Sequence, residues 1–472
     1  MVQSVLLDTV LDLTGEPRFI TVPFDVPEHT SRLRVTGRFA TTQPAQIPLA
    51  LADSRKQLRG MQVNEFSRDS AEHILETSAF QAGKGCLSGP VHPGKWHVII
   101  YCRYLPETVA YHLQVTAESG TDTKRMPFGT AQRPPEVLDH RKRWYCGELH
   151  MHSSESTGKA SAEEVIQAAQ DHKLDFIALT DHFSVSHWDI IDNLDHQKPP
   201  LVIKSMELSG ERGHANLHGL HSWINPFVDC DGELLDALGL AEWSMNHAAQ
   251  AAHEQGGLFC INHPISGRVA WRYEDVDCSL ADLLEVVCLP DGPPSFLYPV
   301  LWDRFLLDGY RMTGIGSSDS LDERSIIDSL KRGRVYTSLG DTRMDMHVEL
   351  TSPGEAPQSV PMGCTARIRD DAAADLVVQL WDHPKGNLFI IKDGLLVGVL
   401  SVQGSQAHGD DREVLRFPLS PPNTKGGKAS YVRSEFHEET VKPYYVIMAH
   451  RDHASIRAIS NPVWLTRRDH GN

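Results

Sequence analysis

Histidines and acids recur at the ends of short apolar runs between residues 150 and 319. In chain order they are His150, His152, His182, Glu207, His214, His263 and Asp319. Because side chains alternate along a strand, a His-x-His on an extended segment presents both imidazoles on the same side. Imidazoles that converge with carboxylates form divalent-metal sites in proteins. The repeated pattern therefore predicts a metal-dependent hydrolase.

Strands that alternate with helices are expected to position these residues. A capping box formed by Ser161 and Glu164 predicts a helix that runs to His172. Further strands are expected at 174–180, 201–206, 258–261, 283–288 and 310–316, and helices at 233–254, 300–307 and 322–331. This alternation predicts a parallel sheet buried on both faces. Because the candidate ligands follow the strand ends, we expect a distorted β/α (TIM-like) barrel over residues 140–345.

Both flanks are predicted to be rich in β-strands. Residues 1–135 show strand-like alternation separated by turn signals, which predicts a β-sandwich, for example at 18–24, 32–36 and 96–101. A stretch without periodicity at 132–136 predicts the boundary with the barrel. Residues 346–472 form the predicted C-terminal β-rich domain, with strands at 376–381, 388–392 and 444–448 and an Asp393-Gly394 hairpin signal.

Composition narrows the class of protein. A net charge of -17 over 472 residues disfavours duplex nucleic acid as a partner, because non-specific binding neutralises phosphates with Lys and Arg. No apolar run approaches the ~20 residues of a membrane span, and the N-terminus lacks the basic region of a signal peptide. The eight cysteines include no C-x-x-C pair, which favours buried reduced thiols over disulfides. We therefore expect a cytoplasmic protein without a membrane partner that acts on a small-molecule substrate.

The order of six motifs resembles the PHP (polymerase and histidinol phosphatase) metallohydrolase superfamily over residues 144–340. The motifs are Gly-Glu-Leu-His150-Met-His152-Ser, Leu-Thr-Asp-His182, the isolated Glu207, Gly-His214-Ala-Asn, Asn-His263-Pro and Gly-Ser-Ser-Asp319. Residues 89–98 and 459–465 are similar to the carbaryl-hydrolase-like (CehA/McbA) branch, in which the barrel lies between β regions. By this resemblance one ion would be held by His150, His152, Glu207 and Asp319. Glu207 would bridge to a second ion, completed by His214 and His263.

The resemblance breaks down at the third metal position of the family. The three corresponding places in this chain read Thr157, His182 and Leu321. Thr is a poor ligand and Leu is none, so we expect two divalent ions (Zn, Mn or Fe) rather than three. Without a third ion, His182 is a candidate catalytic residue that donates a proton to the leaving group or binds a phosphoryl oxygen. The alternative for His182 is a structural hydrogen-bonding role.

Two more residues are candidates for catalysis. Arg268 follows His263 by one short loop, and its planar guanidinium suits an anionic substrate, although a surface salt bridge explains it equally well. His218 follows His214 closely and is either a pocket residue or a loop or core histidine. Asp181 is a candidate for orienting His182 or another ligand.

Three functions remain open from the sequence. The first is a phosphatase or phosphodiesterase that attacks a phosphorylated small molecule or nucleotide with a metal-bridging hydroxide. The second is a carbamate or amide hydrolase with the same dinuclear site. The third is a non-catalytic binding protein with a relict barrel, and the intact ligand set counts against it.

Overall fold

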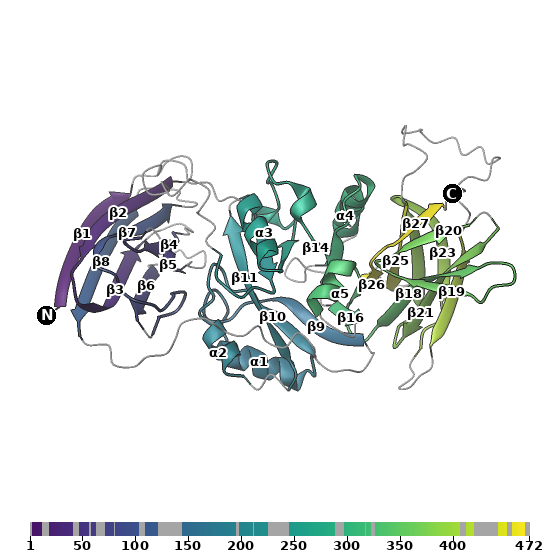
Figure 1. Cartoon of the computed structure of the whole chain (residues 1–472), viewed down its shortest axis with the longest axis horizontal. Helices are drawn as coiled ribbons and strands as arrows, with labels where there is room; N and C mark the ends of the chain where they lie inside the picture. The colour runs from purple at the N-terminus through teal and green to yellow at the C-terminus, as the bar shows by residue number, and fades with distance from the viewer. Residues whose placement is uncertain are drawn as a thin grey trace. The chain divides into compact units, whose positions relative to one another are not determined.

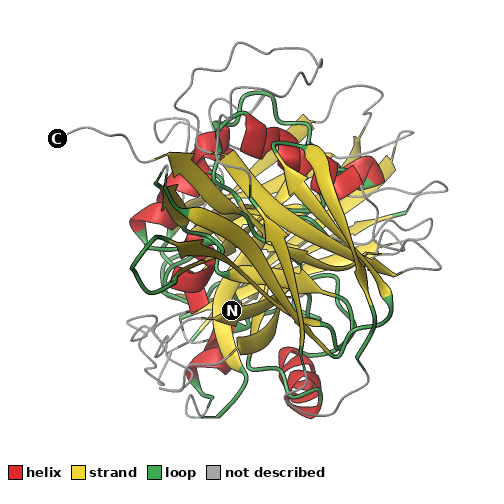
Figure 2. Cartoon of the chain, turned by 90° about the vertical axis from the view of Figure 1, so that its right-hand side faces the viewer, coloured by secondary structure: helices red, strands yellow, loops and turns green. Residues whose placement is uncertain are grey.

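The computed structural model describes a multidomain, strand-rich protein. It covers residues 2–11, 18–40, 47–55, 58–62, 71–79, 81–102, 109–120, 144–194, 198–210, 212–224, 245–287, 297–316, 318–321, 326–369, 371–405, 412–419, 442–450 and 456–467. Strands dominate this part of the chain and helices are short (Figure 2). The chain divides into two compact units. The first holds 1–135, 149–259 and 272–280, and the second holds 136–148, 260–271 and 281–472.

The first unit begins with two four-stranded antiparallel sheets, purple to blue in Figure 1. One has the order β1 (Val2–Leu11), β8 (Val109–Ser119), β3 (Thr30–Phe39), β6 (Ala71–Ser78). The other has the order β2 (Arg18–Val26), β7 (Gly94–Cys102), β4 (Leu49–Ala52), β5 (Leu58–Gln62). Inward residues of both sheets, such as Val35 of β3 and Val98 of β7, share one apolar core. Two sheets over a common core form a β-sandwich.

A curled half-barrel sheet has the order β13-β12-β11-β10-β9 in one part, of which the first unit holds β10, β11, β12 and the residues of β9 and β13 that lie within 149–259. The strands are β9 (Trp144–Met151), β10 (Phe176–Leu179), β11 (Leu201–Gly210), β12 (Gly213–His218) and β13 (Leu258–Ile261). Helices α1 (Ala162–Asp171), α2 (Trp188–Asp192) and α3 (Met245–Glu254) and the 3₁₀ helix η2 (Cys278–Leu280) connect or flank them. The predicted capping box of α1 is present, because Ser161 and Glu164 bond each other's backbone N–H.

The sheet is mixed, whereas the sequence predicted a parallel one. β10 and β11 are parallel, but β11 and β12 form an antiparallel hairpin. Only two residues separate Gly210 from Gly213, and a parallel crossover needs a dozen or more. The prediction was therefore wrong for β12, and a closed β/α barrel stays a prediction.

The second unit holds the rest of the half-barrel sheet and further β-strands. β14 (Leu283–Glu285) and β15 (Thr313–Ile315) continue in parallel from Cys260 of β13. From Trp144 of β9 the order is β16 (Ser318–Leu321), β17 (Val335–Ser338), β26 (Ile456–Ser460), β25 (Lys442–His450), β22 (Gly386–Lys392), β23 (Leu395–Val402), and β27 (Val463–Arg467) pairs with β20 (Thr365–Ile368) and β25. A separate sheet has the order β19 (Gln358–Pro361), β18 (Arg343–Thr351), β21 (Ala373–Trp381), β24 (Glu413–Pro418). The remaining helices are η1 (Gly267–Val269), α4 (Leu297–Leu307) and α5 (Ile326–Arg332).

Asn461 joins the last strands of the second unit to its half-barrel sheet. Its buried side chain accepts a hydrogen bond from the Gly314 N–H and donates to the carbonyls of Gly314 and Val335, each at 2.8 Å. One amide thus links β15, β17 and the turn between β26 and β27. Strands β26 and β27 are part of the same sheet as β15 and β17.

The structure tests one of the predictions made for the two flanks. The Asp393-Gly394 turn joins β22 and β23 with positive φ at both residues, which confirms the predicted hairpin. The predicted boundary at 132–136 lies outside the described residues, and the three predicted domain limits stay predictions. Within the described residues, no helix has the length and apolar character needed to cross a membrane.

Candidate metal centre

Four neighbouring strands of the first unit bring five of the predicted residues together. His150 lies near the end of β9 and His152 directly follows it, His182 lies just beyond β10, Glu207 lies in β11 and His214 in β12. The bridge between His182 and Glu207 extends the parallel pairing of β10 and β11 by backbone bonds. The convergence therefore follows from the strand register.

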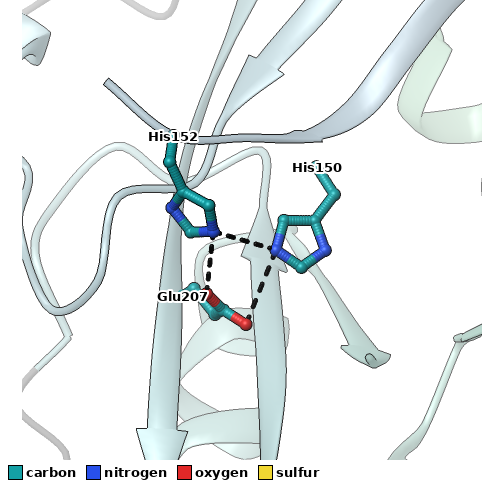
Figure 3. A group of neighbouring side chains, drawn as sticks. All are labelled: His150, His152 and Glu207. Carbon is teal, nitrogen blue, oxygen red and sulfur yellow. Dashed lines mark hydrogen bonds and ion pairs between the residues drawn. The ribbon is translucent and has the colours of Figure 1, made fainter. Parts of the chain in front are cut away.

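His150, His152 and Glu207 form a group that could hold a metal ion (Figure 3). The two Nε2 atoms lie 3.2 Å apart, and they lie 3.5 Å (His150) and 3.3 Å (His152) from the Glu207 oxygens. Bonds of about 2.0–2.1 Å to a tetrahedral Zn²⁺ place ligand atoms about 3.3–3.4 Å apart. The spacing of the three donor atoms thus fits a divalent ion.

Glu207 is fully buried at the centre of four imidazoles. Its Oε1 lies near His150 and 3.1 Å from His214 Nδ1, and its Oε2 lies near His152 and 2.7 Å from His182 Nδ1. Burial by itself raises the pKa of this carboxyl, but the surrounding histidines hold it well below its usual range. Glu207 is therefore an ionised carboxylate with two histidine nitrogens within 3.5 Å of each oxygen.

The state of His152 also suits metal binding. Burial, together with the proximity of His182, lowers the pKa of His152 to about 3. Its imidazole is therefore neutral near pH 7, and neutral imidazole is the form that binds metal ions.

His182 is held through one ring nitrogen. Nδ1 shares a hydrogen bond with the Ser209 hydroxyl and lies 2.7 Å from Glu207 Oε2. The His182 ring lies 4.4 Å from the His152 ring between centroids. The sequence analysis missed Ser209, although it lies two residues after Glu207 and so shares its face of β11.

The other four predicted residues are His218, Arg268, Asp319 and His263. His218 is fully buried and shares a hydrogen bond with the Ser205 hydroxyl at 3.1 Å, so the structure shows no exposed surface for it to meet a substrate. The side chains of Arg268 and Asp319 lie outside the described residues, although their backbones lie in η1 and β16. His263 belongs to the second unit, where its N–H donates to Glu285 at 2.6 Å. The roles of these four residues stay predictions.

The structure describes only part of the third metal position. Thr157 lies in the turn after His152. Glu155, the nearest acid in that turn, accepts a hydrogen bond from the Ser186 hydroxyl. The side chain of Leu321 lies outside the described residues. The number of ions stays a prediction.

Comparisons with known proteins leave the family open. No family model matches the chain, and no curated protein matches it. Among solved structures it is similar to a two-domain protein from Bacteroides vulgatus containing a predicted PHP-like metal-dependent phosphoesterase, with 16% identity and a TM-score of 0.32 over 71% of this chain and 99% of that one. It is also similar to a structure from infectious bursal disease virus, with 8% identity and a TM-score of 0.17 over 26% and 33%. At these TM-scores neither likeness carries an argument, and membership of the PHP superfamily and its CehA/McbA branch stays a prediction.

Proposed function

We propose that this protein is a metal-dependent hydrolase. The observation that carries the proposal is the buried, ionised Glu207 with four histidine nitrogens within 3.5 Å of its two oxygens. Imidazole nitrogens and carboxylate oxygens that converge in this way are the ligands that divalent Zn, Mn or Fe would take. Such ions act as Lewis acids and lower the pKa of water.

Each side chain of the cluster has a distinct task in this proposal. His150 and His152 would hold one ion, His214 would hold the other, and Glu207 would be shared between them. By resemblance to the PHP motifs, Asp319 and His263 would complete the two sites.

His182 is the proposed general acid. Its Nδ1 meets Glu207 and Ser209, so Nε2 is the ring nitrogen that can meet a substrate. The side chain is 13% exposed, in contrast to the fully buried Glu207. An imidazole fixed at one nitrogen and accessible at the other can deliver a proton to a leaving oxygen.

Phosphoesters are the proposed substrate class, because a metal pair suits in-line displacement at phosphorus. The test is a panel of p-nitrophenyl phosphate, bis-p-nitrophenyl phosphate and a 1-naphthyl carbamate, assayed with Zn²⁺, Mn²⁺ or Fe²⁺ and after chelation. We expect turnover of at least one phosphoester that chelation abolishes and the metal restores. Turnover of the carbamate alone would replace the phosphoesterase by a carbamate hydrolase. Metal binding without turnover of any compound would favour a binding protein.

A further inference from the structure

The buried carboxylate of Asp181 joins the two segments that carry His152 and His182. Asp181 is not one of the five clustered residues, which are His150, His152, His182, Glu207 and His214. Asp181 is fully buried, and its oxygens receive four polar contacts. Ser153 donates its N–H to Oδ1 at 2.8 Å and its hydroxyl to Oδ2 at 2.6 Å. The Ser156 hydroxyl donates to Oδ1 at 2.6 Å, and His187 Nδ1 lies 3.1 Å from Oδ2. We call Asp181 with Ser153, Ser156 and His187 the Asp181 hub.

The hub joins the two segments at the residues next to the histidines. Asp181 directly precedes His182, and Ser153 directly follows His152. One step back, Thr180 bonds Met151 through its backbone N–H and its hydroxyl, at 2.8 and 3.1 Å to the Met151 carbonyl. Successive bonds at 151/180 and 153/181 leave His152 and His182 little freedom to move apart.

The turn after His152 is held equally closely. The Gly158 N–H donates to the Ser153 carbonyl at 2.9 Å, and a Cβ added at Gly158 would lie 2.3 Å from the His152 carbonyl oxygen. This turn therefore lies directly against the His152 backbone, and Asp181 fixes its start and, through Ser156, its middle.

We propose that Asp181 is a positioning residue of the metal centre, which sets the His152 imidazole relative to that of His182 through Ser153. The sequence left open whether Asp181 orients His182 or another ligand, and the proposal names His152, because the carboxylate of Asp181 binds the segment that follows it. The inference rests on the proposed function, since it concerns the residues assigned to the metals. His187, without a metal-ligand pattern in the sequence, belongs to the support of this carboxylate.

The test compares Asp181→Asn with Ser153→Ala and a matched control. Asn keeps an oxygen that can accept the Ser153 N–H. Its NH2 group replaces Oδ2, which accepts the Ser153 hydroxyl in the wild-type protein. The control is Asp53→Asn, which alters a carboxyl of similar burial (2% exposed) in the sandwich, where Asp53 accepts the Arg55 N–H at 2.8 Å. The readouts are the dissociation constant for Zn²⁺ and Mn²⁺ by titration calorimetry, the visible spectrum of Co²⁺-loaded protein, and the thermal midpoint.

We expect Asp181→Asn to weaken metal binding by about 10- to 100-fold, the usual cost of disturbing a group that orients metal ligands. The Co²⁺ spectrum should change, and Ser153→Ala should shift both readouts in the same direction by less. Asp53→Asn should lower the thermal midpoint alone. Folded Asp181→Asn with wild-type affinity and spectrum would overturn the proposal, and if that variant does not fold, unchanged binding in Ser153→Ala would do so. Absence of metal binding by the wild-type protein would instead refute the proposed function.

Discussion

Replacing Glu207 by Gln should lower the stability of the metal-free protein and that of the metal-loaded protein. The substitution keeps the shape of the fully buried side chain and removes its charge. Without metal, and despite burial, the surrounding histidines hold the pKa of Glu207 well below its usual range, so the fold favours the ionised carboxylate over a neutral side chain. A carboxyl whose pKa is depressed in the fold contributes stability at neutral pH. Glu207→Gln should therefore make the metal-free protein less stable than the wild type at pH 7.

The metal-loaded protein should lose most of its metal-dependent stability. Replacing a residue that orients a metal ligand weakens metal binding by about 10- to 100-fold. Glu207 is itself a proposed ligand, 3.3 Å from His152 and 3.5 Å from His150, so its loss should weaken binding by at least about 100-fold. That factor equals about 2.8 kcal/mol of binding free energy. An ion at about 100 times its Kd stabilises the wild-type fold by about 2.7 kcal/mol, whereas at an unchanged concentration the variant would gain only about 0.4 kcal/mol.

Thermal unfolding with Zn²⁺ or Mn²⁺ and with chelator, together with metal content by mass spectrometry, measures both effects. The matched control is Glu163→Gln, an exposed acid in the first turn of α1, which should bind metal like the wild type. Full metal content and a wild-type metal-induced shift in Glu207→Gln would refute the assignment of Glu207 as the bridging ligand. Unchanged stability of Glu207→Gln without metal would refute the argument that the histidines favour the ionised carboxylate in the fold.

Three further predictions follow from single side chains. His182→Asn should lower kcat by about 100-fold, as expected for a general acid, and retain two ions by metal analysis, whereas loss of an ion would make His182 a ligand. His73 is buried in the sandwich, and burial lowers its pKa to about 4. Because His73 of the unfolded chain is protonated already below about pH 6.5, the free energy of unfolding should fall by up to about 3 kcal/mol between pH 6.5 and 4. Urea unfolding of His73→Leu should show a smaller fall over this pH range. Asn461→Ala leaves three buried backbone groups without their amide partner and should cost about 3 kcal/mol, measured by denaturant unfolding, and a loss under 0.5 kcal/mol would contradict it.

Local signals in the sequence predicted individual elements well. The Ser161 capping box predicted the start of α1, and the strand expected at 258–261 has those bounds. The positive φ values that Asp393-Gly394 favours produced the predicted turn. Each of these features depends on residues that are close in the sequence. They can therefore be predicted without knowing which segments pack against them.

Pairing partners were harder to predict. The ring of His218 faces Ser205, 13 residues away, and that of His182 bonds Ser209, 27 residues away. Both contacts depend on the register of β11 with its neighbours, which no local motif fixes. His187 carried no ligand spacing at all, and only its contact with Asp181 gives it a place at the site.

The hydrogen bonds of Asn461 have a consequence for the biosynthesis of the chain. Its amide bonds Gly314 and Val335, which precede it by 147 and 126 residues. A ribosome adding about 5–20 residues per second therefore needs about 7–30 seconds after Gly314 before this link can form. During that interval β15 and β17 lack their amide partner, and such exposed strand edges are prone to aggregation. Slow translation of the last strands should thus lower the yield of folded protein more than slow translation of the sandwich.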